Sequence, residues 1–194
     1  MTDVQFIGAA NPAQSARVAD AESSASVDRV ENIAVRARRV ATVAAAFADE
    51  VDRDGRFPVE AIAAAKAERL MGVLAPQSLG GEGLAHHQVV EACFILGHAC
   101  ASSALIYAMH QVKAACITRH GRGSAWHEAF LSRLCADQLL LASSTTEGQA
   151  GGNVRSSEAP VIEEAGRIRL SRDASVISYG EAAASGERRP PTRS

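Results

Sequence analysis

The sequence predicts an α+β fold: an N-terminal all-α helical bundle followed by an incomplete antiparallel β-domain. Between residues 28 and 137, apolar residues recur at intervals of three and four, the period of amphipathic helices. From 138 to 181 the pattern changes to short apolar runs bounded by turn residues, which is typical of strands. We expect residues 1–27 to be a disordered segment and 182–194 to be an irregular tail, because neither has an apolar period.

Composition excludes several classes of protein. With 47% apolar residues, the 194-residue chain can build a core, and a net charge of -2 argues against a nucleic-acid partner. No apolar run reaches the ~18 residues of a membrane helix, and the N-terminus does not resemble a signal peptide. We therefore expect a cytoplasmic protein without a membrane partner. The cysteines lack paired spacing, which favours free thiols over disulfides or a metal site; they are Cys93, Cys100, Cys116 and Cys135.

The first two helices are predicted from their ends and their apolar stripes. Asp28 and Glu31 form a candidate capping box, and "DRDG" at 52–55 ends the first helix. Its expected core face consists of Val30, Ile33, Ala37, Val40, Ala44, Phe47 and Val51. Pro58 suits the first turn of the second helix, and Gly72 is its expected stop. The inward residues of that helix are Val59, Ile62, Ala63 and Leu70.

Three more helices are expected after a loop that contains one proline and three glycines. Residues 87–100 are apolar nearly all round, as in a central helix. The next helix carries an apolar stripe of Leu105, Met109, Val112 and Cys116. The last one begins with Ser124 as a cap, and its shared face consists of Trp126, Phe130 and Leu134.

The remaining chain is expected to begin a sheet. "LLLASS" at 139–144 is too short for a helix and is predicted to be a strand. Residues 159–171 form a predicted hairpin with its turn at 163–166, and 174–180 form a third strand. So few strands with open edges are marginal alone. We therefore expect an incomplete fragment, and the tail at 182–194 suggests truncation or a frameshift.

Three motifs occur in order along the chain: "APQSLGGEGL" at 75–84, "TTEGQAGGNV" at 145–154 and "VIS" at 176–178. The first is similar to a Pro-x-x-x-Gly-Gly-x-Gly loop. The second is similar to a Thr-Glu-Pro-x-x-Gly-Ser-Asp motif, and the third lies about thirty residues after Thr146. Together the motifs resemble the acyl-CoA dehydrogenase family of flavoproteins, and the resemblance covers residues 28–181.

The resemblance implies an FAD site. The backbone of Ser144, Thr145 and Thr146, with the Thr146 hydroxyl, would bind the polar edge of the flavin. Val176, Ile177 and Ser178 would form a second wall. The residue types agree with this role, because hydroxyls at a strand end are donors and Gly151 and Gly152 allow close backbone approach. Taken without the other motifs, the same stretch would be read as a plain turn between strands.

The implied reaction is α,β-dehydrogenation of an acyl-CoA or related acyl thioester, with hydride passing to FAD. In the family the catalytic base comes from a C-terminal helical domain, so no catalytic residue is assigned here and the chain alone is expected to be inactive. Full-length members are homo-oligomers. Gly152 replaces a Ser that contacts cofactor or acyl-CoA, which leaves a flavin monooxygenase and a dehydrogenase of carrier-bound acyl groups open as alternatives. A separate alternative is a non-catalytic helical module that binds a partner through the unfinished face of the fragment.

Histidines give no metal motif in this sequence. His86 and His87 are expected to cap a helix or to lie in solvent. His127-Glu128 begins like a zincin motif, but Leu131 occupies the position of the second His. No Gly-x-Gly-x-x-Gly follows a strand, so a Rossmann nucleotide site is not predicted.

Overall fold

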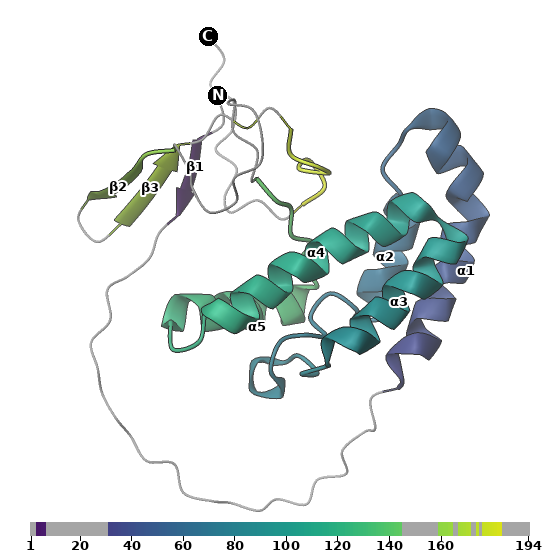
Figure 1. Cartoon of the computed structure of the whole chain (residues 1–194), viewed down its shortest axis with the longest axis horizontal. Coiled ribbons are helices and arrows are strands. Elements are labelled where there is room, and N and C mark those ends of the chain that lie inside the picture. Colours follow the sequence, from purple (N-terminus) through teal and green to yellow (C-terminus); the bar gives the residue numbers. More distant parts are fainter. Residues whose placement is uncertain are drawn as a thin grey trace, which may run out of the picture.

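The computed structural model describes residues 3–6, 31–144, 159–164, 167–171, 174 and 176–183 (Figure 1). The helices are α1 (Ile33–Asp54), α2 (Val59–Ala67), the 3₁₀ turn η1 (Gln77–Leu79), α3 (His86–Ala99), α4 (Ala101–His120) and α5 (Ala125–Asp137). The strands are β1 (Asp3–Phe6), β2 (Val161–Glu164) and β3 (Arg167–Ser171). A helical domain followed by antiparallel strands confirms the predicted α+β fold class.

Helix α1 follows the predicted apolar stripe but begins later than predicted. Its N-cap is Asn32, whose Oδ1 accepts from the Ala34 N–H at 2.8 Å. Asp28 lies outside the described residues. The helix ends at Gly55, which adopts the left-handed φ of 59° that terminates helices. Of the predicted stripe, the buried members are Ile33, Ala37, Val40, Ala44 and Val51, whereas Phe47 is half-buried.

The buried face of α2 differs from the predicted face. Ile62 is buried as expected, but Val59 is 56% exposed and Ala63 is also exposed. The buried face instead runs through Ala61, Ile62 and Ala65, since small residues allow α2 to pack closely on α1. The helix stops at Ala67, before the predicted Gly72.

Helices α3 and α4 pack side by side as a hairpin (Figure 1), and each exposes apolar residues that were expected to be buried. Val90 and Phe94 on α3 are 65% and 67% exposed, so α3 is not the central helix that was predicted. On α4, Leu105 and Val112 are 62% and 57% exposed. The predicted stripe of α4 therefore faces outward, and the buried face is Ser103, Ala104, Tyr107, His110, Gln111 and Ala114.

The main core lies where α1, α2, α3 and α4 meet the turn after α2. Fully buried Leu70 and Met71 lie in that turn and pack with Val40, Leu96 and Tyr107. A second cluster joins α5 to the loop after the turn through Leu131, Leu134 and Cys135. The four cysteines are free, as predicted. On α5 the Trp126 and Phe130 rings stack at 5.7 Å between centroids, in agreement with their predicted shared face.

The predicted hairpin is confirmed, with β2 and β3 antiparallel and Val161 opposite Leu170. Strand β2 extends to Glu164, so Glu163 and Glu164, which were predicted in the turn at 163–166, belong to the strand. Strand β1 pairs with the other edge of β3, giving the order β1-β3-β2. It lies within residues 1–27, where no regular structure was expected. Backbone hydrogen bonds to the free edge of β3 hold β1 in the sheet. Because backbone groups make these bonds, they leave no pattern of side chains in the sequence.

Two predicted strands are wrong. Residues 139–144 are unpaired chain, in which Leu140 and Leu141 are buried by the helices. Residues 178–183 form turns, and the described residues just before them are not in a strand either. Leu140, Leu141 and Tyr179 in these segments pack against the helical domain, whereas Val176 is exposed. No helix within the described residues is long and apolar enough to cross a membrane.

Candidate functional site

The structure describes half of the predicted flavin wall. Ser144 is exposed in the segment that follows α5. In the second wall, Val176 is 62% exposed, whereas Ile177 and Ser178 are half-buried. The other predicted residues lie outside the described ranges; they are Thr145, Thr146, Gly151 and Gly152.

A hydrogen bond brings the two described parts of this wall together. The Tyr179 hydroxyl donates to the Leu141 carbonyl oxygen at 3.0 Å, and the Tyr179 ring packs against the main core. Ser144 follows Leu141 closely, and Val176 shortly precedes Tyr179. Segments far apart in the sequence are therefore held next to each other, as a two-walled site requires.

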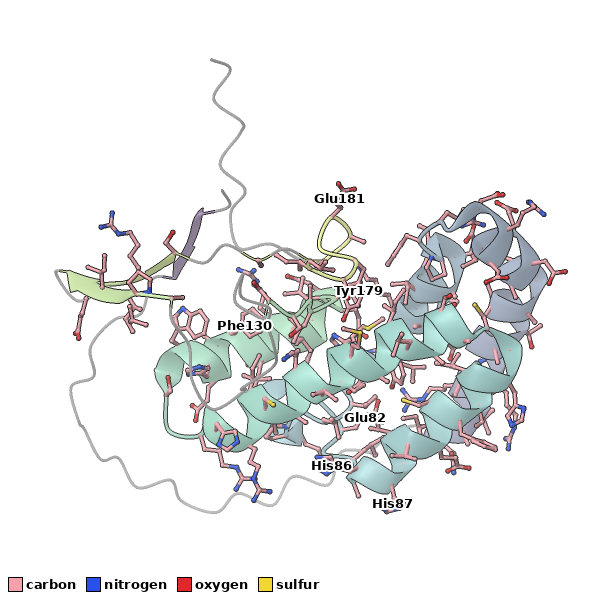
Figure 2. All side chains as sticks on the ribbon, turned by 45° about the horizontal axis from the view of Figure 1, so that its top comes forward. Glu82, His86, His87, Phe130, Tyr179 and Glu181 are labelled. Carbon is pink, nitrogen blue, oxygen red and sulfur yellow. The ribbon has the colours of Figure 1, made fainter. Side chains whose placement is uncertain are left out.

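The backbone at Tyr179 is bent to make this contact. Its φ is 45°, a left-handed conformation that is costly for a large side chain and persists only where surrounding contacts enforce it. The turn is closed by the Gly180 N–H, which donates to the Ile177 carbonyl oxygen at 3.1 Å. Partial burial raises the pKa of the Tyr179 hydroxyl, so it remains a donor at neutral pH. Glu181, at the tip of the turn, points away from the helices (Figure 2), and we assign it no role as a base.

Leu141 is fixed from its other side by His110. The Leu141 N–H donates to His110 Nδ1 at 3.0 Å, so the proton of the neutral ring lies on Nε2, which donates to the Met71 carbonyl at 2.8 Å. The His110 side chain is fully buried. Burial lowers its pKa to about 4, although the hydrogen bond to Met71 acts in the opposite direction. A neutral imidazole therefore joins the turn after α2 to the start of the predicted wall.

Two neighbours of His110 complete a buried polar face on α4. The Tyr107 hydroxyl and the Gln111 Nε2 both donate to the Leu70 carbonyl oxygen, at 3.2 and 2.8 Å. Burial raises the pKa of Tyr107, which keeps this hydroxyl protonated. These donors satisfy carbonyls of the turn after α2 that would otherwise be buried without partners. Sequence reasoning missed Tyr107, His110 and Gln111 because polar residues are expected on the solvent face of a helix.

The glycine-rich loop has a packing role that its residues explain. A Cβ at Gly81 would lie 2.1 Å from the Ala75 carbonyl oxygen, so no other residue fits without backbone movement. Glu82 forms a bidentate ion pair with the buried Arg36 of α1, at 2.7 and 2.8 Å. Arg36 also donates to the Glu68 carbonyl at 3.1 Å. The loop is thereby anchored to α1 and to the end of α2, beside a cavity of about 170 Å³.

The structure does not bring together the histidines that the sequence analysis considered as possible metal ligands. His86 and His87 are exposed at the start of α3, next to the loop that carries Glu82 (Figure 2). His127 Nδ1 lies 2.8 Å from the Ser124 hydroxyl, which therefore does not cap the α5 backbone as predicted. Among the described residues, no group of His, Cys, Asp or Glu side chains is arranged to hold a metal ion.

Comparison with protein families gives one match. Residues 28–138 match the family described as "Acyl-CoA dehydrogenase, N-terminal domain". The match covers the helical domain and ends where the chain leaves α5. No curated protein matches the chain.

Proposed function

The chain belongs to the acyl-CoA dehydrogenase family through its N-terminal domain, and from that premise we propose that it is part of a flavin-dependent oxidoreductase. The proposed reaction is α,β-dehydrogenation of an acyl-CoA or related acyl thioester. FAD is the proposed cofactor, and a homo-oligomer is the proposed assembly. The single observation that supports the proposal is the hydrogen bond between Tyr179 and Leu141, which holds the segment before Ser144 beside the segment after Val176.

The residues at this junction fit a flavin edge. Ser144 carries a hydroxyl and is exposed in the segment after α5, and the exposed side chain of Val176 offers an apolar surface on the facing segment. A flavin ring needs this combination, because its polar edge accepts and donates hydrogen bonds and its faces are apolar. We propose that Thr145 and Thr146 add donors beside Ser144.

The bound flavin would supply the hydride acceptor. The residues of this chain would bind and orient it: hydroxyl and N–H donors from Ser144 to Thr146 would fix its polar edge. Gly151 and Gly152 would let the backbone approach the ring or its pyrophosphate. Ile177 and Ser178 would exclude water from the opposite side. No residue of this chain is assigned the proton-abstracting role, so we expect no turnover from it alone.

A second candidate function is a non-catalytic helical interaction module. The large apolar side chains that the α3–α4 hairpin exposes favour it, since apolar surface left in solvent can mark an interaction site. They are Val90, Phe94, Leu105 and Val112. This candidate predicts no affinity for flavin, which separates it from the first.

The test is titration of the purified chain with FAD, followed by quenching of flavin fluorescence. We expect saturable binding that Thr146→Ala weakens and Gly151→Val abolishes. Ser102→Ala, at an exposed position on α4, is the matched control and should leave the affinity unchanged. A folded chain, helical by circular dichroism, that binds no FAD would contradict the proposed cofactor site and favour the interaction module.

A further inference from the structure

A groove of about 350 Å³ lies between the glycine-rich loop, the start of α3 and the C-terminal end of α4, and the proposed flavin site does not use it. Its floor is apolar and includes Leu74, Leu84 and Ala115. Its polar lining comes from three elements, so the tertiary structure alone assembles it. A concave apolar site with a few convergent polar groups is the usual form of a small-molecule site.

The charged groups of this groove are all basic. Arg119 lies in the last turn of α4 and Arg122 lies in the turn that follows, and both side chains are exposed. None of the residues that line the groove is acidic. Neither arginine takes part in an ion pair within the described part of the chain. Two guanidinium groups that have no ion-pair partner among the described residues therefore border the same apolar floor.

A buried hydroxyl in the groove is also unpaired. Thr118 lines the groove, and its Oγ1 is buried without a hydrogen-bond partner among the described residues. A buried hydroxyl without a partner is destabilising, and each such group in a folded protein calls for an explanation. A ligand oxygen that accepts from Thr118 would satisfy it.

The start of α3 adds partial positive charge. His86 lines the groove as the first residue of α3, and its N-cap is Ala85, which has no side-chain acceptor. The first turn of α3 contains no acidic residue. The Gln88 Oε1 accepts from the Ala85 N–H at 3.0 Å, but no acidic side chain of this first turn compensates the positive dipole end of α3.

We propose that this groove binds the phosphate group of a small phosphate-bearing molecule. Arg119 and Arg122 pair with the phosphate oxygens, Thr118 donates its hydroxyl, and the apolar floor supports the organic part of the ligand. The arginines also lie near the C-terminus of α4, where cations are favourable. Stabilising the C-terminus of a helix would not by itself require the arginines to border a groove or an unpaired hydroxyl.

The experiment is isothermal titration of the full chain with inorganic pyrophosphate and with adenosine diphosphate, at ionic strength held constant with chloride. We expect saturable binding that the double variant Arg119→Gln/Arg122→Gln weakens by about tenfold or more, as loss of two charge-assisted contacts requires. Arg133→Gln, which removes an exposed arginine of α5 outside the groove, is the matched control and should leave the affinity unchanged.

A third variant separates a ligand site from a charged surface. Thr118→Val keeps the shape of the side chain and removes the unpaired hydroxyl, so it should weaken pyrophosphate binding without lowering the melting temperature. Tighter binding of adenosine diphosphate than of pyrophosphate would support a nucleotide ligand, and equal binding would support free pyrophosphate. Absence of binding, equal loss in Arg133→Gln, or unchanged affinity in Thr118→Val would overturn the proposal.

Discussion

The buried His110 predicts how the stability of the helical domain depends on pH. Its imidazole is fully buried, accepts from the Leu141 N–H and donates to the Met71 carbonyl, an arrangement that requires the neutral ring. Burial is the main cause of its low pKa of about 4, and the charge of Lys66 acts in the same direction. In the unfolded chain its pKa returns to about 6.5.

The direction of the pH dependence follows from which state, folded or unfolded, binds the proton at His110. Between about pH 6.5 and 4 the unfolded chain binds a proton at His110 that the folded chain does not. The free energy of unfolding therefore falls as the pH falls through this window. Above about pH 6.5 the folded protein keeps the full stability contribution of the neutral His110. The difference between about 6.5 and about 4 corresponds to a total of about 3 kcal/mol, of which about 2.5 kcal/mol is lost between pH 7.5 and 4.5.

The measurement is urea denaturation of the wild-type chain and of His110→Phe at several pH values from 7.5 to 4.5. His110→Phe should be less stable at pH 7.5, because it leaves the Met71 carbonyl and the Leu141 N–H unpaired, but its stability should decline less steeply with acid. His120→Gln, at an exposed position, is the control and should keep the wild-type slope. An equal slope in wild type and His110→Phe would refute the reasoning.

Three further predictions concern the packing around the site. Gly81→Ala should lower the free energy of unfolding by about 2 kcal/mol or more, because the added Cβ would lie 2.1 Å from a carbonyl oxygen. Gly83→Ala is the comparison: its added Cβ has no atom within 4 Å, but the φ of 64° disfavours alanine, so it should cost only about 1 kcal/mol in the same urea titration. Arg36→Met should destabilise by about 2–3 kcal/mol, because it leaves the half-buried Glu82 without its partner, and adding Glu82→Leu should restore most of the melting temperature. No recovery in the double variant would count against an ion-pair effect. Tyr179→Phe should cost about 1 kcal/mol and speed hydrogen exchange at 176–183, and unchanged exchange there would show that the hydroxyl does not hold the turn.

The sequence determined those features that depend on neighbours along the chain. The spacing of apolar residues in α1, the left-handed stop at Gly55 and the antiparallel hairpin of β2 and β3 all follow from local geometry, and the structure has them. The family was also recognisable from the sequence, since the glycine-rich loop at 75–84 lies within the matched domain. Helix start signals were less reliable, because Asn32 and not Asp28 caps α1.

Only the tertiary structure decided which face of α4 is buried. The apolar stripe through Leu105 and Val112 predicted the wrong face, because Tyr107, His110 and Gln111 find partners inside the protein. Those partners are carbonyls of a turn far earlier in the chain, and no periodicity along α4 can reveal them.

The same reason explains the two strands that were wrongly predicted. Leu141 and Tyr179 lie in segments with strand-like patterns, but a hydrogen bond between them and burial against the helices replace strand pairing. For Leu140 and Leu141 the apolar pattern indicated burial correctly, whereas the surface that buries them is set by long-range packing. For this chain, the sequence alone determined the fold class and the family, and the tertiary structure decided how the segments of Leu141 and Tyr179 are brought together.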